Sequence, residues 1–322
     1  MKFDKLRVGV IGVGHMGEYH VQKYTSLSDV DLVGVADINP DRANEVGARY
    51  GTEVFENHHE ILKRVDAVSL AVHTTAHFEV AKDVLSKGIH LLIEKPITYK
   101  LEPANTLLDM AEEKELVLQV GLVERFNPAV VKMKSLLKEP VFIEAHRMNV
   151  FTPRGTDADV VFDLMIHDLD IILHMVPFKV KELHAVGMSV VTGMTDIANV
   201  RIIFENGVTA NLSVSRVSHK TIRKIRVYQP GLYMEADCSK RSINITRLDN
   251  GNGELADLRQ LKPETLDFPD SDPLADQIAS FVNAVTNGSE PVVSGNDGRK
   301  VLKISLDIIN QIKGRSDSIQ AI

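Results

Sequence analysis

A glycine-rich turn, GVGHMG at residues 12–17, constrains the fold of this chain more than any other feature. It follows a short apolar run at 6–11 and opens a segment with helical spacing. In that context G-x-G-x-x-G indicates a dinucleotide-binding βαβ unit. Gly12 permits the tight turn, Gly14 lets a pyrophosphate approach the backbone, and Gly17 lets the helix pack against the strand. The alternative is a strand-turn-helix unit whose small residues serve packing alone.

An acidic residue follows at the distance that a dinucleotide site requires. Asp37 lies 20 residues after Gly17, at the end of the second predicted strand. A carboxylate there can bind the adenosine ribose hydroxyls and would repel the extra phosphate of NADP, so NAD is the expected cofactor and NADP the less favoured one. Arg42 lies close enough to weaken that preference. We expect His15 and Met16, inside the turn, to contact the cofactor as well.

The chain divides into two halves with different patterns. At 322 residues it is long for a single core and suits two domains. Short β-rich runs alternate with amphipathic runs in the first half, which predicts an α/β fold: a Rossmann doubly wound parallel sheet over 1–125. Strand follows strand over 180–248, and Asn206-Gly207 is a strong hairpin signal. Residues 126–322 therefore predict an α+β domain with a large, mostly antiparallel open sheet, whose last helix can pack back on the first domain.

The triplet Glu94-Lys95-Pro96 ends a predicted parallel strand, at the edge where open α/β sheets bind ligands. A lysine there can stabilise negative charge that develops on a substrate oxygen. Pro96 fixes the following turn and is able to adopt a cis bond. The triplet alone is also compatible with a solvated lysine in an ordinary loop.

A polar stripe runs along the apolar helix predicted near 160–175. Asp163, His167, Asp170 and His174 recur at helical spacing, so they share one face. An imidazole can exchange a proton near neutral pH, and an aspartate one turn away can orient it. Two other interpretations stay open: a structural network of core or interdomain contacts, and a zinc or manganese site.

Residues after another predicted strand extend the cofactor site. His73 and His77 straddle the start of a helix, so they are expected to line the cofactor pocket rather than bind metal. Val72 and Thr74 belong to the same expected set. We predict no metal site, and the sequence has no Walker A, G-x-S-x-G or C-x-x-C motif that would indicate phosphoryl transfer, serine hydrolysis or thiol redox chemistry.

Composition excludes several classes of protein. The net charge of −7 argues against a nucleic-acid partner. No apolar run approaches the roughly 18–20 residues that cross a bilayer, so no membrane partner is expected. The opening MKFDKLRVGVIG lacks the features of a signal peptide, and Cys238 is the single cysteine. A reducing, cytoplasmic location is therefore predicted.

Together these motifs resemble the glucose–fructose oxidoreductase, inositol dehydrogenase and MocA family of nicotinamide oxidoreductases. The resembling stretches are VGVIGVGHMGEYHVQKY, AVHTTAHFEVAKDVLSKGIHLLIEKPIT, FDLMIHDLDIIL and the closing PLADQIASFVNAVTNGSEPVVSGNDGRKVL. The resemblance implies a Rossmann domain followed by a substrate-binding sheet that commonly mediates oligomers, here a homodimer or homotetramer. One departure is Thr74, where many relatives have proline, and it leaves the packing of the nicotinamide open.

Roles follow from the resemblance position by position. Lys95 matches the family's catalytic lysine, Asp163 its acid and His167 its imidazole, which would accept the substrate hydroxyl proton. Glu94 matches a residue near the nicotinamide ribose. The implied enzyme transfers hydride between NAD and a secondary alcohol of a sugar or sugar nucleotide. Alternatives are a cyclitol such as myo-inositol as substrate, a dinucleotide-binding sensor or regulator without catalysis, and a metal-dependent enzyme.

A narrower resemblance concerns VERFNPAV at 123–130 and RGTDADVVFDLMIHDLDI at 154–171. These stretches are similar to the branch that oxidises the 3-hydroxyl of UDP-N-acetylglucosamine. Arg125, Arg147 and Arg154 are candidates to meet a substrate pyrophosphate. The same arginines are equally compatible with structural salt bridges.

Overall fold

In the computed structural model the chain forms two compact units, residues 1–123 with 274–302 (unit 1) and residues 124–273 with 303–322 (unit 2). The structure describes residues 5–152, 158–247 and 263–320, the last six by their backbone alone. The observed boundary at 123/124 lies beside the expected one at 125/126. The difference is 274–302, which was expected in the second domain and belongs to unit 1.

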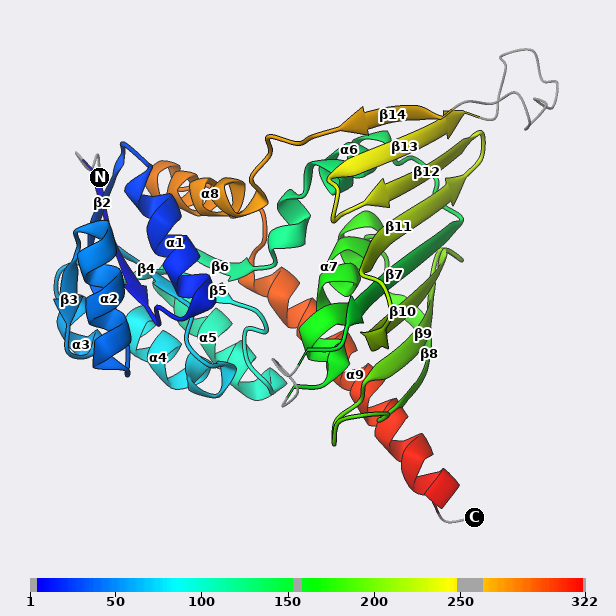
Figure 1. The fold of residues 1–322 in the computed structure, drawn as a ribbon, viewed down its shortest axis with the longest axis horizontal. Coiled ribbons are helices and arrows are strands. Elements are labelled where there is room, and N and C mark those ends of the chain that lie inside the picture. The colour runs from blue at the N-terminus through cyan, green and yellow to red at the C-terminus, as the bar shows by residue number, and fades with distance from the viewer. Residues whose placement is uncertain (1–4, 153–157, 248–262, 321–322) are drawn as a thin grey trace. The chain divides into compact units, whose positions relative to one another are not determined.

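Unit 1 is a doubly wound α/β domain around a six-stranded sheet in which every strand pair is parallel, in the order β3-β2-β1-β4-β5-β6 (Figure 1). Its strands are β1 (Leu6–Ile11), β2 (Val30–Ala36), β3 (Glu53–Phe55), β4 (Ala67–Leu70), β5 (His90–Glu94) and β6 (Leu118–Gly121). Its helices are α1 (His15–Thr25), α2 (Pro40–Tyr50), α3 (His58–Ile61), α4 (Thr74–Ser86), α5 (Leu101–Glu113) and α8 (Pro273–Asn287). This topology confirms the predicted Rossmann sheet.

Helix α8 belongs to unit 1 because of its apolar face. Ile278, Phe281 and Val282 recur at helical spacing, and they are buried in one core cluster with Tyr24 of α1 and with side chains of β1. Burying side chains of this size stabilises a fold by about 1.5–3 kcal/mol each. A segment that lies late in the chain, α8, therefore completes the hydrophobic core of the first domain.

Unit 2 is built on an eight-stranded sheet in the order β14-β13-β12-β11-β7-β10-β9-β8. Its strands are β7 (Phe142–Val150), β8 (Val180–Met188), β9 (Ile197–Phe204), β10 (Thr209–Ser218), β11 (Ile222–Gln229), β12 (Leu232–Asp237), β13 (Ser242–Arg247) and β14 (Glu264–Asp267). The pair β7–β10 is parallel and the other pairs are antiparallel. The expected large, mostly antiparallel sheet is confirmed.

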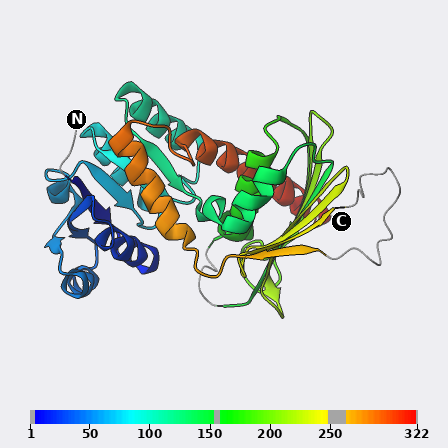
Figure 2. The ribbon, with the colours of Figure 1, turned by 90° about the horizontal axis from the view of Figure 1, so that it is seen from above.

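Helical segments cover one face of this sheet. They are a 3₁₀ turn (Val123–Phe126), α6 (Pro128–Leu136), a π-helical turn (Val161–Met165), α7 (Ile166–Met175) and the later part of α9 (Gly295–Gln320). Alternate residues along the strands are buried, as in β9, and α7 lies against the covered face near β7 (Figure 2). The other face presents the intervening, more exposed residues.

The predicted hairpin is confirmed between β9 and β10. Gly207 has φ of +86°, a left-handed conformation that glycine adopts without steric cost. Among the described residues, no helix has the length and apolar character to cross a membrane.

Candidate active site

The glycine turn after β1 is shaped by three different requirements. Gly12 has φ of +82°, and a Cβ there would lie 2.7 Å from Val72. A Cβ on Gly17 would lie 1.8 Å from the carbonyl oxygen of Gly12, whereas one on Gly14 would have no heavy atom within 4 Å. Gly14 is the N-cap of α1 and no side chain caps that helix end. Uncapped amides facing open space suit a pyrophosphate, so the turn fits a dinucleotide.

Asp37 lies beside this turn, as its spacing predicted. Its carboxylate accepts hydrogen bonds from the backbone amides of Val13, at 2.7 Å, and of Asn39, at 2.9 Å. These bonds hold the side chain at the end of β2, where it remains partly exposed. The position suits contact with a ribose.

Arg42 is engaged within the chain instead. Its Nε donates to the carbonyl oxygen of Val13 at 2.9 Å, and its guanidinium pairs with Glu18 and Glu45. Burial would raise the pKa of Glu18, but hydrogen bonds from Arg42 and Arg49 outweigh it and lower the pKa. Two arginines and two glutamates thus balance their charges. The expected contact of Arg42 with the cofactor stays a prediction.

His77 joins two strand-end loops. Its Nδ1 lies 2.9 Å from the carbonyl oxygen of Pro96 and its Nε2 lies 3.1 Å from that of Val72. Burial lowers the pKa of this ring despite both carbonyls, so a neutral His77 donates to one of them at a time. The side chain is 1% exposed. His77 therefore braces the loops after β4 and β5, and its expected contact with the cofactor stays a prediction.

The other residues that are predicted to bind the cofactor follow β1 and β4. Val72 packs over Gly12, and Thr74 is the first residue of α4 and is half-buried. Met16 is half-buried, and the exposed ring of His15 packs edge-on against Tyr19. Their contact with a cofactor remains a prediction.

The Glu94-Lys95-Pro96 triplet ends β5 at the same carboxyl edge of the sheet. The Lys95–Pro96 peptide bond is cis, as its sequence allowed. The Lys95 side chain is half-buried, whereas Glu94 is 9% exposed. The carboxylate of Glu94 accepts from the backbone amide of Lys95 at 3.3 Å. Glu94 is thus folded back onto its own strand.

In unit 2, the predicted helical stripe divides by burial. Asp163 lies in the π-helical turn and His167 in the first turn of α7, and both side chains are partly exposed. π-helical turns inside helices frequently occur at functional sites. Asp170 is fully buried and pairs with Arg125, whose Nε donates to it at 3.0 Å. The first two residues are therefore suited to chemistry, and Asp170 to structure.

A second buried network extends from the same helix. Arg147 is 2% exposed and donates to Asp168 at 2.7 Å and to Glu124 at 3.0 Å. Burial alone would lower the pKa of Arg147. The carboxylates of Asp168 and Glu124 raise this pKa by more than burial lowers it, so the guanidinium stays charged. Arg125 and Arg147 are thus paired with buried carboxylates, and their expected role toward a pyrophosphate stays a prediction. Arg154 lies outside the described residues.

In the part of the chain that the structure describes, the residues with the spacing of metal ligands are not those of the Asp163 stripe. Among the described residues, the group with metal-compatible spacing is His58, His59 and Asp83, whose ligand atoms lie within 4.8 Å of one another. That group lies on α3 and α4 of unit 1.

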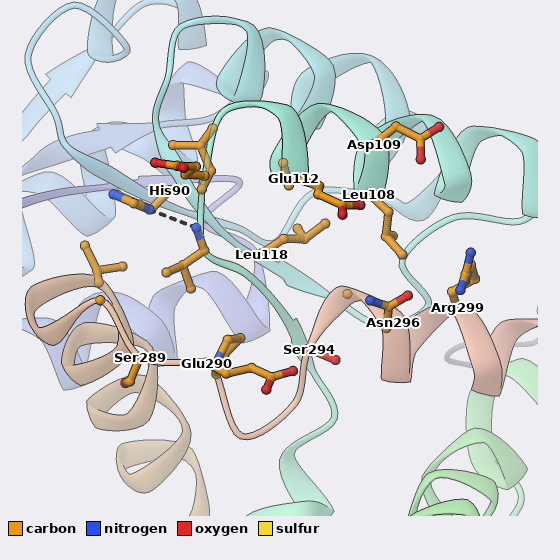
Figure 3. A pocket seen from close by; sticks show the side chains of 18 residues that line it. His90, Leu108, Asp109, Glu112, Leu118, Ser289, Glu290, Ser294, Asn296 and Arg299 are labelled. Atoms are coloured by element: carbon orange, nitrogen blue, oxygen red, sulfur yellow. Dashed lines mark hydrogen bonds between the residues drawn. The ribbon is translucent and has the colours of Figure 1, made fainter.

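A cavity of unit 1 lies at the opposite end of the sheet. It has a volume of about 500 Å³ and is lined by the starts of β5 and β6, α5 and the beginning of α9 (Figure 3). His90 lies on its wall and accepts a hydrogen bond from the amide of Val117 at 3.0 Å. Parallel strands bind ligands at their carboxyl ends, so this cavity is separate from the glycine turn.

Sequence reasoning missed one buried cluster near the triplet. His20 is fully buried on α1, with Ser69 and Glu94 as polar neighbours. The spacing of His20 could have indicated its burial. His20 lies three residues after Gly17 and directly before the buried Val21, so it shares the face of α1 that packs against the sheet.

Comparisons with known proteins agree with this geometry. A family described as "Oxidoreductase family, NAD-binding Rossmann fold" matches residues 6–122, and the GFO/IDH/MocA C-terminal domain matches residues 134–240. UDP-N-acetylglucosamine 3-dehydrogenase of Acidithiobacillus ferrooxidans is 37% identical over 94% of this chain and 96% of its own. A solved structure of that enzyme has a TM-score of 0.89 at 35% identity, covering 97% of this chain and 99% of its own.

More distant relatives extend the comparison. Myo-inositol 2-dehydrogenase of Thermotoga maritima is 24% identical over 92% of this chain and 93% of its own. Levoglucosan dehydrogenase, solved with NADH and levoglucosan, shares the fold with a TM-score of 0.86 at 18% identity, covering 96% of this chain and 98% of its own. The chain belongs to the GFO/IDH/MocA family of NAD-binding oxidoreductases.

Proposed function

We propose that this dehydrogenase oxidises the 3-hydroxyl of UDP-N-acetylglucosamine. The observation that carries the proposal is the similarity to the Acidithiobacillus enzyme, 37% identical over 94% of the chain. The inositol dehydrogenases are relatives at lower identity. A cyclitol is therefore the second candidate substrate.

The proposed chemistry assigns one task to each of three side chains. His167 accepts the proton of the substrate hydroxyl, which a neutral imidazole can do near neutral pH. Lys95 stabilises the negative charge that develops on that oxygen. Asp163 orients the site. These roles require one substrate carbinol to lie within hydrogen-bond reach of both Lys95 and His167.

NAD is the proposed cofactor, and when bound it accepts the hydride. The open face of Gly14 and the uncapped start of α1 support a pyrophosphate site. Asp37 places a carboxylate beside the turn, and the charge of Arg42 is neutralised by Glu18 and Glu45. A 2′-phosphate would therefore meet repulsion without a compensating cation, which supports NAD over NADP.

We also propose a homodimer or homotetramer formed through the uncovered face of the unit 2 sheet. Phe142, Tyr228 and Tyr233 form a row of neighbouring rings on three strands, with centroids 5.8 and 5.0 Å apart. Aromatic side chains are enriched at protein interfaces. The proposed setting remains the cytoplasm, without a nucleic-acid or membrane partner.

The test is turnover by the purified protein. It is incubated with NAD and, in separate reactions, UDP-N-acetylglucosamine, other UDP-sugars, and myo- and scyllo-inositol, while nicotinamide absorbance is followed. The proposal expects reduction of NAD with UDP-N-acetylglucosamine at the highest kcat/KM. A higher kcat/KM with a cyclitol would favour the second candidate. Cofactor binding without turnover on any of them would favour a sensor.

A further inference from the structure

A buried polar row connects α1 to the strand that carries Lys95. His20 is fully buried, and its Nδ1 lies 2.8 Å from the hydroxyl oxygen of Ser69, which lies 3.1 Å from that of Tyr24. The Nε2 of His20 lies 3.2 Å from Oε1 of Glu94. All four residues belong to unit 1. A row of this kind is costly to bury unless its donors and acceptors match.

The hydrogen-bonding groups match in one direction. With the ring proton on Nε2, that nitrogen can only donate, and it lies on the side of Glu94. Nδ1 then accepts from the hydroxyl of Ser69, which in turn accepts from the hydroxyl of Tyr24. Nε2 lies 3.2 Å from Oε1 but makes no hydrogen bond in this geometry. The ring is therefore a close polar neighbour of Glu94.

The strand beside Glu94 leaves room for its carboxylate. Gly121 of β6 pairs with Glu94 of β5, and a Cβ on Gly121 would lie 2.4 Å from Oε1. The second oxygen, Oε2, accepts from the backbone amide of Lys95. His20 and the missing side chain of Gly121 thus confine one carboxylate, and that carboxylate binds the backbone that presents Lys95.

We infer that His20 is a positioning residue for the reaction, acting on Lys95 through Glu94. This inference rests on the proposed role of Lys95. Removing the Nε2 atom of His20 leaves the buried carboxylate of Glu94 without this polar neighbour, so the carboxylate shifts. That shift releases the amide of Lys95. A displacement of about 1 Å of a catalytic group can cost on the order of a hundredfold in rate.

Two isosteric substitutions separate positioning from simple core filling. In His20→Gln the side-chain amide reaches the place of Nε2 and keeps a donor for Glu94. In His20→Asn it reaches the place of Nδ1, which keeps the contact with Ser69 and loses the one with Glu94. We expect His20→Asn to lower kcat by about tenfold to a hundredfold while KM for NAD changes less than about threefold. His20→Gln should recover most of the loss.

Gly121→Ala perturbs the same carboxylate from the opposite side. Its methyl group would overlap Oε1, so we expect a loss of kcat similar to that of His20→Asn. Thermal unfolding of all three variants identifies any that fail to fold. NADH affinity is read from its own fluorescence, because the chain contains no tryptophan.

A readout independent of turnover completes the experiment. Hydrogen exchange of the segment 93–97 should rise in His20→Asn and stay near wild type in His20→Gln, because Glu94 accepts from the Lys95 amide. Equal kcat and equal exchange in the Asn and Gln variants would overturn the inference. If wild-type protein turns over no substrate, the proposed function fails, and the exchange comparison alone still decides whether His20 holds the strand end.

Discussion

Asp37 is a single carboxylate whose surroundings decide which cofactor the turn accepts. It is fixed by two backbone amides, and the nearby Arg42 is paired with glutamates. The charge that a bound cofactor would meet at this turn therefore depends on Asp37. Two other single residues, Lys95 and His167, carry the proposed proton and charge chemistry.

Replacing Asp37 should relax cofactor choice. Asp37→Ser removes the repulsion toward a 2′-phosphate, so we expect the ratio of kcat/KM for NADP to that for NAD to rise by about tenfold or more, equivalent to roughly 1.4 kcal/mol. The kinetics of wild type and variant with each cofactor measure it. Arg42→Ala is the comparison variant, and an unchanged ratio in Asp37→Ser would contradict the prediction.

Lys95→Ala and His167→Ala should each lower kcat by about a hundredfold or more, because they remove charge stabilisation and general base catalysis. Lys100→Ala and His59→Ala, at exposed positions, are matched controls expected to keep wild-type rates. Steady-state kinetics with the true substrate provide the measurement. Near-normal turnover by either site variant would withdraw that residue's role.

At the scale of elements, two glycines in the turn between β1 and α1 serve different purposes, one in folding and one in binding. Gly17 meets the backbone of Gly12, whereas Gly14 faces open space at a helix start. Both glycines belong to one motif, yet the structure gives them different tasks.

The pair Gly14→Ala and Gly17→Ala tests this division. Gly17→Ala forces a methyl group against a carbonyl oxygen and should lower the free energy of unfolding by about 1–3 kcal/mol. Gly14→Ala should keep wild-type stability and weaken NADH binding, because the methyl group occupies the approach to the backbone. Denaturant unfolding and NADH fluorescence give the two values. Equal losses of stability in both variants would refute the division.

Local signals predicted most elements and the cofactor turn. Gly12, Asp37 and Asn206-Gly207 each act through nearby backbone, so spacing alone placed them. The carboxylate partners of Arg147 and Arg125 lie 21 to 45 residues away along the chain, on α7 and in the 3₁₀ turn, and sequence spacing carries no signal for such pairs. Sequence spacing also carries no signal for the packing of α8 in the core of unit 1, or for the contact of His20 with Glu94.

At the scale of the whole molecule, buried histidines make stability depend on pH. Burial lowers the pKa of His77 and of His90, the second opposed weakly by Asp66. In the unfolded chain these rings titrate near about 6.5. Between that pH and the lower folded pKa, the unfolded state binds more protons, so stability falls as pH decreases.

We therefore expect the free energy of unfolding of unit 1 to fall as the pH drops below about 6.5 and to vary less above pH 7. His90→Asn removes one titrating ring while keeping an acceptor at the place of Nδ1 for the amide of Val117, so it should flatten this dependence. Denaturant unfolding at several pH values is the measurement. His59→Asn, at an exposed position, serves as the control. A slope for His90→Asn equal to that of wild type would be inconsistent with the assignment.

In the proposed reaction, hydride leaves C3 of the sugar for the nicotinamide of a cofactor whose pyrophosphate binds at the glycine turn. The most direct measurement uses UDP-N-acetylglucosamine deuterated at C3, with mass spectrometry of the NADH formed. The account predicts NADH that carries the deuterium. Unlabelled NADH, or no reduction while an unrelated substrate reacts, would contradict it.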